Sequence, residues 1–564
     1  MSRVKRLIQE LRRRRVFRVA VVYAAVAFVV WQAAEIAFPA LNVPEWALTL
    51  IIVVTLLGFP IALVLGWAFD ITPEGLRRTG GQESPVPPAE AEGLERVTPA
   101  RKSIVVLPFD NMSPDPQDAY LSDGLTEEII TALSCCDPLR VISRTSARAL
   151  KGTQKDIRTI ARELEVQYVL EGSVRKAGNQ LRITAQLIDA VNDAHVWAEK
   201  YSGTLEDVFE MQERISRSIV RTLRLRLTPD EQRRLVERPI DNVQAYECYL
   251  RARQESWLFT KEALDRAVQY LRNGLEIVGE NAVLYAGLGY VYSQYVNIGA
   301  EHEAYIDQAE DYARKALELK ADCAEAHLVL GFVNEAFRGD QRKSIHHYRE
   351  ALRINPDDPH VLVWLSVTFS VVGKTPEAYP LIERAVKVDP LTPMTQYMPG
   401  FLDLMEGRFE RALGPTEQWF RMDPQNPAAL FFYAQTLAYA QRFKEASRLV
   451  ADNAASSRDA FTQASLLVRW AAEGDVKEMR ELPTEDVAKT MRRDPQYSFF
   501  AASMFALAGL QDEAMDWLEN AVSRGFINYP WLSEYDPFLT KLCGDPRFVV
   551  MLEGVKREWE QFEL

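Results

Sequence analysis

The spacing of apolar residues changes along the chain, and each change predicts a different kind of structure. Residues 16–38 and 46–69 are almost uninterrupted apolar runs, each longer than the ~20 residues that a helix needs to cross a bilayer. Between residues 103 and 228, short apolar runs alternate with helical patterns, which is typical of an α/β domain. From about residue 240 onward the apolar positions recur at helical spacing. We therefore expect three regions of different architecture.

The two apolar runs predict a two-helix transmembrane hairpin. Residues 39–45 connect them and contain two prolines, which favours a tight turn. Arginines flank the open end of the hairpin at 12–15 and 77–78, and the connector has no Lys or Arg. Because basic loops stay on the cytoplasmic side, we expect a multi-pass protein of the inner membrane with both termini in the cytoplasm.

A stripe of small residues follows one face of the second run. Gly58, Ala62 and Gly66 lie four residues apart, a spacing that lets a facing helix approach closely. The facing helix is either the first run or the same run of a second copy, so a homodimer stays open. Glu35 is the single acidic residue offered by the first run, which favours an anchor over a pump or proton relay.

The region after the hairpin predicts a mixed sheet covered by helices. Residues 79–102 are rich in Pro, Gly and Glu and indicate a flexible spacer. Strands are expected at 104–109, 139–143, 168–175, 181–189 and 194–201, and helices at 124–134, 156–164 and 205–227. Strict alternation of apolar and polar residues from Leu181 to Leu187 predicts a strand with one buried face. Gly178 suits a hairpin turn between the third and fourth strands.

The C-terminal half repeats itself with a period of 34 residues. Ala378, Ala412 and Ala446 keep this interval, and prolines at 356, 390 and 424 keep it too. This period, with a small residue in one helix and proline at the end of the unit, is typical of tetratricopeptide repeats. We expect an all-α solenoid of about eight helix pairs at 240–529, sealed by a capping segment at 530–564.

A solenoid of this type offers a concave surface lined by the first helix of each pair. Aromatic side chains on such a surface are typical anchors for a protein partner. The positions expected to face this groove are Tyr290, His327, Phe332, Tyr397, Phe401, Phe431, Gln435 and Tyr439. The alternative is that several of these side chains pack into the neighbouring repeat.

Composition and motifs argue against several function classes. The net charge is −13, and residues 1–18 are strongly basic, so the rest of the chain is acidic and ill suited to nucleic acid. The five cysteines are scattered without disulfide or metal-site spacing. No nucleotide-binding, hydrolase or metalloprotease motif occurs in a fitting context. The sequence therefore predicts no catalytic residue, no cofactor, no metal and no enzymatic activity.

A family resemblance covers about residues 102–228. The segments that carry it, in order, are SIVVLPFDNMSPDPQDAYLSDGLTEEIITALS, LRVISRTSA, YVLEGSVRKAGNQLRITAQLIDA and HVWAEKYSGTLEDVFEMQERI. They resemble the TolB amino-terminal-like domain, which often precedes tetratricopeptide repeats in bacterial proteins, some with an adenylate cyclase domain upstream. The resemblance implies a non-catalytic module with protein-binding associations. The terminal DPRF segment and the apolar hairpin also look like those of membrane-anchored members.

These observations lead to one expected function and one alternative. We expect a membrane-anchored scaffold or adaptor that binds protein partners through the repeat groove. The alternative is a sensory module, in which the α/β domain binds a small molecule and the repeats relay the signal. The expected regions are a basic N-terminus at 1–15, two transmembrane helices within 16–69, a linker at 70–102, the TolB-like domain at 103–228, the solenoid at 240–529 and the cap at 530–564.

Overall fold

The computed structural model describes residues 69–72, 75–78, 101–256, 260–297, 303–454 and 460–564. The chain divides into two units, Met1–Val97 and Thr98–Leu564, which we describe separately. In the first unit, strands β1 (Phe69–Thr72) and β2 (Gly75–Arg78) form an antiparallel pair with Phe69 opposite Arg78.

The structure corrects the expected transmembrane hairpin and the multi-pass inner-membrane location that followed from it. Across the ranges that the structure describes, no helix is both long and apolar enough to span a bilayer. Phe69, taken as the end of the second span, lies in β1, because the sequence that follows it turns back and pairs with it as β2. The rest of 1–69, including Gly58, Ala62 and Gly66, lies outside the described residues.

The second unit begins with a mixed sheet, as the sequence predicts. Its strand order is β5–β3–β6–β7–β8, with the short β4 beside β6. Strand β3 pairs parallel to β5 and β6, whereas β6, β7 and β8 pair antiparallel. The strands are β3 (Lys102–Val106), β4 (Asp110–Asn111), β5 (Leu139–Val141), β6 (Tyr168–Ala177), β7 (Gln180–Asp189) and β8 (Ala194–Thr204). The expected alternation holds in β7, where Leu181, Ile183, Ala185 and Leu187 are buried.

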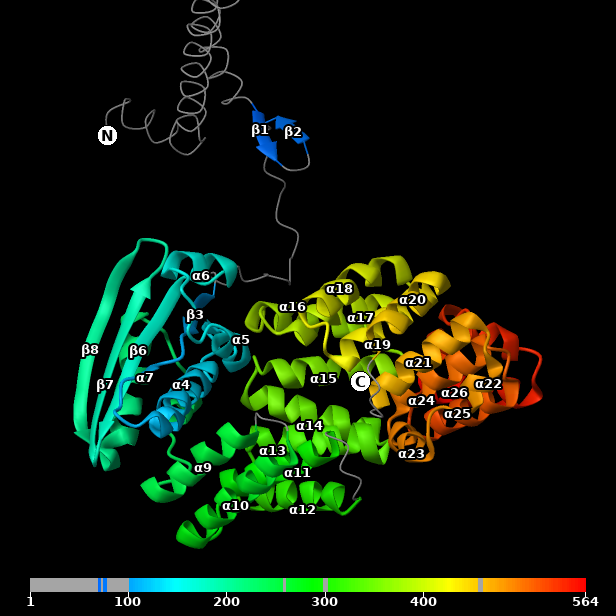
Figure 1. Cartoon of the computed structure of the whole chain (residues 1–564). Helices are drawn as coiled ribbons and strands as arrows, with labels where there is room; N and C mark the ends of the chain where they lie inside the picture. The colour runs from blue at the N-terminus through cyan, green and yellow to red at the C-terminus, as the bar shows by residue number, and fades with distance from the viewer. Residues whose placement is uncertain (1–68, 73–74, 79–100, 257–259, 298–302, 455–459) are drawn as a thin grey trace, which may run out of the picture. The chain divides into compact units, whose positions relative to one another are not determined.

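Helices cover the side of this sheet that faces the rest of the unit (Figure 1). Helices α4 (Ala119–Ser134), α6 (Ile157–Glu163) and α7 (Val208–Thr222) pack on the strands, and α5 (Arg144–Ala149) and α8 (Pro229–Leu235) pack on α4. The single helix expected at 205–227 is shorter, because Arg224 adopts φ = 50° after α7 and Thr228 caps a separate helix. We call the strands β3–β8 and helices α4–α8 the α/β domain.

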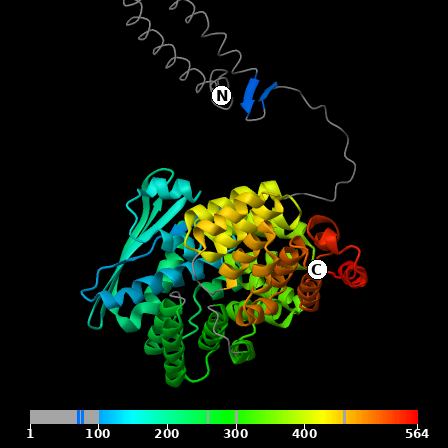
Figure 2. The same cartoon turned by 45° about the vertical axis from the view of Figure 1, so that its right-hand side comes forward.

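The remaining chain consists mainly of helix pairs stacked side by side, which we call the repeats (Figures 1 and 2). The pairs are α9 (Val243–Ser256) with α10 (Lys261–Val278), α11 (Ala282–Asn297) with α12 (Glu303–Leu319), α13 (Ala324–Phe332) with α14 (Gln341–Ile354), α15 (Pro359–Val371) with α16 (Tyr379–Val388), α17 (Pro393–Met405) with α18 (Phe409–Met422), α19 (Pro427–Tyr439) with α20 (Phe443–Asn453), α21 (Ala460–Glu473) with α22 (Val476–Arg480), and, after α23 (Glu485–Arg493), α24 (Pro495–Leu507) with α25 (Gln511–Ser523).

Small residues at the crossing points let the two helices of a pair approach. A Cβ added to Gly289 of α11 would lie 3.1 Å from the carbonyl oxygen of Ala309 in α12. Ala378, Ala412 and Ala446, which keep the 34-residue period, have no exposed surface. The 34-residue period therefore marks the positions at which the two helices of each pair pack closely, as in tetratricopeptide repeats.

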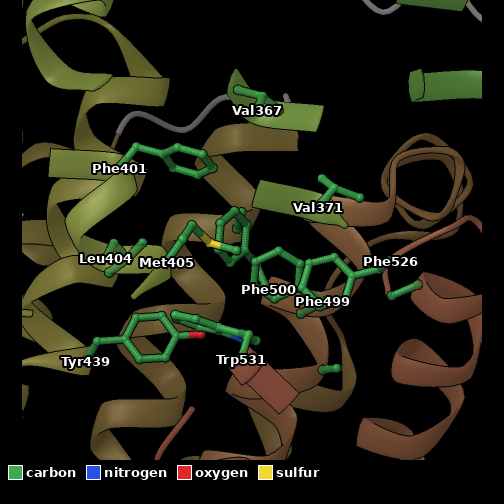
Figure 3. Close-up of a cluster of buried hydrophobic side chains, with 14 of the residues drawn as sticks. Val367, Val371, Phe401, Leu404, Met405, Tyr439, Phe499, Phe500, Phe526 and Trp531 are labelled. Atoms are coloured by element: carbon green, nitrogen blue, oxygen red, sulfur yellow. The ribbon is translucent and has the colours of Figure 1, made fainter. Parts of the chain in front are cut away.

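The C-terminal segment, residues 526–542, packs against the first helices of several pairs. It contains the turns η5 (Trp531–Tyr535) and η6 (Leu539–Leu542), and helix α26 (Pro546–Glu560) follows it. The Trp531 ring lies 5.3 Å from that of Tyr439 in α19 and 5.7 Å from that of Phe499 in α24, both nearly edge-on (Figure 3). Trp531 has no exposed surface, so the segment belongs to the core.

Hydrogen bonds tie the same segment to the middle repeats. The Ile527 amide donates to the carbonyl of Val371 at 3.1 Å, and the Asn528 side chain donates to the carbonyl of Ser370 at 2.7 Å. The indole of Trp559 in α26 donates to the carbonyl of Gly373 at 2.9 Å. These hydrogen bonds join the C-terminal segment and α26 to the end of α15, which lies much earlier in the sequence.

A buried acidic residue lies near this junction. Glu335, in the π-helical turn η3 (Val333–Arg338), is 1% exposed, and neither carboxylate oxygen has a hydrogen-bond partner among the described residues. Burial raises the pKa of Glu335 well above its ordinary value, and the nearby Asp494 carboxylate raises it further. Burial also raises the pKa of Asp494 to about 6. Tyr348 and Tyr497 face the same site.

Because the pKa values of Glu335 and Asp494 are raised in the folded state, we expect the stability of the protein to fall as the pH rises. In the unfolded state both acids lose their protons near pH 4, whereas in the folded state Asp494 keeps its proton up to about pH 6 and Glu335 to a higher pH. Between these values the folded state holds more protons than the unfolded state, so the free energy of unfolding decreases as the pH rises. We expect the melting temperature to fall by about 5 °C between pH 5 and pH 8. Glu335→Gln should remove most of that fall, whereas Glu383→Gln, on the exposed side of α16, should not. Equal pH profiles for wild type and Glu335→Gln would contradict this assignment.

Candidate functional site

The α/β domain docks on the repeats through the carboxylate of Asp389, which is 3% exposed. Asp389 follows α16 and accepts hydrogen bonds from the hydroxyls of Ser143, Ser146 (2.7 Å) and Thr395 (2.8 Å). The Ser143 amide also donates to the carbonyl of Val388 at 2.7 Å. Ser143 caps α5, so one carboxylate joins a helix start of the α/β domain to a loop between two repeats.

Further polar contacts extend this interface in both directions. The buried carboxylate of Asp357 forms ion pairs with Arg101 at 2.7 Å and with Arg384 at 2.5 Å. The Arg234 guanidinium in α8 donates to the carbonyl of Ile354 at 2.7 Å. Contacts therefore run from α8 to the start of α17, and the domain and the repeats meet over a broad surface.

The interface contains a partly open cavity of about 330 Å³, which we call the interdomain cavity. Helices α4, α7 and α8 contribute one wall, and α9, α11, α13 and the start of α15 contribute the other. Four aromatic side chains line it: Phe209, Tyr246, Tyr249 and Tyr290. The rings of Phe209 and Tyr246 are 4.7 Å apart and those of Tyr246 and Tyr249 are 6.4 Å apart, so three of the four form a continuous aromatic surface.

A charged centre lies beside these aromatic rings. The guanidinium of Arg253 in α9 forms ion pairs with Glu127 of α4 at 3.0 Å and with Glu325 of α13 at 3.7 Å. It also donates to the Tyr249 hydroxyl at 2.8 Å. Glu128, the neighbour of Glu127, lines the same cavity. Residues from three helices, far apart in sequence, thus meet around one arginine.

Burial raises the pKa values of the acids in this centre. The pKa of Glu128 rises to about 7 because of burial, which outweighs the attraction of Arg253. Burial also raises the pKa of Glu325, with Arg253 opposing the shift and Asp358 adding to it. The pKa of Tyr290 rises to about 12, again mainly through burial. The attraction of Arg253 is therefore not enough to keep the pKa values of Glu128 and Glu325 at their ordinary level.

The structure separates the residues expected to face a groove. Tyr290 is half-buried and lines the interdomain cavity. Phe332 is half-buried at the end of α13, and His327 is buried with its Nδ1 3.0 Å from that of His347. The other five are almost fully buried: Tyr397, Phe401, Phe431, Gln435 and Tyr439. Tyr439 and Phe401 belong to the cluster around the C-terminal segment (Figure 3).

The residues of the charged centre were not singled out from the sequence. Glu127 and Glu128 are ordinary acidic positions on an amphipathic helix, and Arg253 lies at the end of another. Only the packing of α4 on α9 brings them together. The one available signal was the pair Glu127–Glu128 between the buried residues Leu125 and Ile129 of α4.

Comparison with known proteins gives two matches in sequence. A family described as the HilA/YgeH-like transcriptional regulator, second domain, matches residues 100–218. A protein of Rhizobium meliloti (strain 1021), named "Putative adenylate cyclase 3", is 42% identical over 235 residues. That match spans 41% of this chain and 40% of the relative, so each protein has much sequence outside it.

Among solved structures, tetratricopeptide-repeat proteins are similar to this chain. One, from Thermus thermophilus, is 14% identical and covers 34% of this chain and 99% of its own, with a TM-score of 0.28. Another, from Parabacteroides merdae, is 14% identical and covers 49% of this chain and 99% of its own, with a TM-score of 0.31. Likenesses this loose carry no functional argument. The helix pairs and their 34-residue period themselves indicate that this chain contains tetratricopeptide repeats.

Proposed function

We propose that this chain is a protein-interaction scaffold whose repeats bind a protein partner. The observation that supports this role is the extended stack of helix pairs, an architecture that presents large surfaces for protein recognition. The Rhizobium meliloti relative bears a cyclase name, but the match spans only 40% of that protein, and we propose a non-catalytic role here.

We further propose that residues 103–228 form a TolB amino-terminal-like module within this scaffold. The segments that carry the resemblance lie on β3, α4 and the antiparallel strands β6, β7 and β8. Because Asp389 joins this domain to the repeats, the module would act as one body with them. The module then serves to present or regulate the partner-binding surface.

The proposed partner surface is an aromatic patch formed by Phe332, Phe337 and Trp364. The Phe332 ring lies 5.3 Å from that of Trp364 and 5.4 Å from that of Phe337, both nearly edge-on. All three side chains are half-buried, so they keep exposed aromatic surface on neighbouring repeats. Such anchors contribute much of the binding energy in protein interfaces. Phe332 is also one of the positions expected to face the groove.

Cross-linked affinity capture with the full chain tests this surface. We expect Phe332→Ala/Trp364→Ala to lose at least one captured protein tenfold or more, because each anchor contributes about 1–2 kcal/mol or more. A matched control is Phe420→Ala/Tyr433→Ala, a half-buried aromatic pair on α18 and α19 with rings 5.9 Å apart. Circular dichroism establishes first that both variants fold. Identical captured proteins for wild type and both variants would contradict the proposed surface.

A second candidate role is sensory, and the interdomain cavity favours it. The cavity lies where the α/β domain meets the repeats, and its volume of about 330 Å³ suits a small molecule. A ligand there would contact both parts and could change how firmly they dock. In this role the α/β domain and the repeats share the binding site, and the repeats relay its occupancy to the protein partner.

A further inference from the structure

We infer that the interdomain cavity binds a small organic cation, an alkylammonium or guanidinium group, between the carboxylates around Arg253 and the aromatic wall. This inference deepens the sensory role and names its ligand class. It is independent of the aromatic patch at Phe332, so the two proposals succeed or fail separately.

Around Arg253, which lines the cavity, acidic side chains outnumber basic ones. Arg253 serves both Glu127 and Glu325, and Arg144 reaches Glu127 only at 3.5 Å. Glu128 forms no ion pair with a Lys or Arg of the described ranges, although it lines the cavity. Asp358 adds a fourth acid near Glu325. Four carboxylates, three of which line the cavity, thus lie around two guanidinium groups.

Away from this centre, two bases of the cavity wall pair with carboxylates, and a third, Arg234, donates to the carbonyl of Ile354 at 2.7 Å. Arg238 pairs with Glu213 at 3.0 Å, and Lys320 pairs with Glu237 at 2.8 Å. Because these bases already have carboxylate partners, they offer little to an anionic ligand. A phosphate or carboxylate entering the cavity would meet Glu128 and Glu325, which share the attraction of Arg253, and like charges at close range are repelled strongly in a partly dry site. The electrostatics therefore select a cation.

Aromatic rings form much of the cavity wall beside this charged centre. Phe209, Tyr246, Tyr249 and Tyr290 line the cavity from both sides of the interface. Ring faces attract ammonium and guanidinium groups within about 6 Å, and the attraction strengthens away from water. The Tyr246 hydroxyl is buried without a hydrogen-bond partner among the described residues.

The volume of the interdomain cavity also indicates a small ligand. A space of about 330 Å³ lies at the lower end of the range for small-molecule sites and exceeds what a single water or bare metal ion fills. A short diamine, an aminoguanidine or the side chain of a basic residue fits this description. The shared chemistry is one cationic nitrogen group at the end of a short apolar chain.

Binding should depend on pH through Glu128. The groups that face it are Glu127 from its own helix, Gln212 from α7, Tyr246, Tyr249 and Arg253 from α9 and Glu325 from α13. Because burial raises the pKa of Glu128 to about 7, this acid is partly protonated near neutrality. A bound cation favours the carboxylate form, so binding releases a proton and tightens as the pH rises from 6 to 8.

Isothermal titration calorimetry of the full chain with agmatine, putrescine and tetramethylammonium tests the inference. We expect saturable binding of at least one of the three, about fivefold tighter at pH 8 than at pH 6. Glu128→Gln should weaken it tenfold or more, and Tyr290→Ala should weaken it while Tyr290→Phe does not. Glu163→Gln, in the exposed ion pair with Lys155 on α6, is the matched control and should bind like wild type.

A second arm distinguishes a free amine from the side chain of a partner. The capped peptide acetyl-Gly-Arg-Gly-amide should bind with similar affinity if the cavity takes a basic side chain, and fail where the small amines bind if it takes a free ligand. Both results support a cationic site. Absence of binding by all four probes at millimolar concentration would overturn the inference, as would equal affinities of wild type and Glu128→Gln. Saturable binding of inorganic phosphate instead would overturn the ligand class and leave the sensory role standing.

Discussion

Replacing Trp531 with alanine should lower the free energy of unfolding of the repeats by about 4 kcal/mol. The indole is fully buried and contacts Phe409, Tyr439 and Phe499, which belong to three different helices. Truncation would leave a cavity that these helices cannot close without losing their other contacts (Figure 3). Removal of a large core aromatic is among the most destabilising single changes for this reason.

Urea unfolding followed by circular dichroism measures this effect. The matched control is Trp470→Ala in α21, where the indole is half-buried and lies under Arg469. We expect the control to cost about 1 kcal/mol, because much of its ring stays in water in the folded state. A loss of under 1 kcal/mol for Trp531→Ala would mean that the C-terminal segment does not occupy the core of the repeats.

The second large effect should come from Asp389→Ala. Its carboxylate accepts hydrogen bonds from Ser143, Ser146 and Thr395, and the variant leaves these buried hydroxyls without their acceptor. Each unsatisfied buried polar group costs about 1–3 kcal/mol, so we expect a loss of about 3 kcal/mol or more. The loss should concentrate at the interface, because two of the three donors belong to the α/β domain.

The repeat itself supplies a control for this variant. Asp423 lies 34 residues after Asp389, at the same position of the next unit, and its side chain accepts a hydrogen bond from Asn426 at 3.0 Å. We expect Asp423→Ala to cost under about 1 kcal/mol, because its partner is local and partly exposed. Equal urea midpoints for the two variants would show that Asp389 does not hold the domains together.

Much of the fold could be predicted from local patterns. Alternating residues from Leu181 to Leu187 predicted the buried face of β7, and Gly178, with φ = 59°, occupies the expected turn. The recurring alanines predicted the helix pairs. The end of α7 was missed, although Thr228 and Glu231 form a capping box that marks a new helix start.

The rest of the site depends on contacts that no local pattern records. Asp389 and Asp423 look alike in sequence, yet only Asp389 meets the α/β domain, 246 residues from Ser143. An aromatic residue on the first helix of a repeat has the same appearance whether it faces solvent or the chain's own C-terminal segment. That segment covers Tyr439, whereas Phe332 stays half-exposed. The position of a residue within the repeat therefore predicts which face of the helix it lies on. It does not predict whether solvent or another segment of the chain covers that face.

The α/β domain and the repeats dock into one body around the interdomain cavity. Hydrogen–deuterium exchange of the full chain tests this docking most directly, at helix α5 and at the start of α17. We predict slow exchange there in wild type and in Asp423→Ala, and much faster exchange in Asp389→Ala while the sheet stays protected. Fast exchange of both segments in the wild type would contradict the docked arrangement and, with it, the cavity.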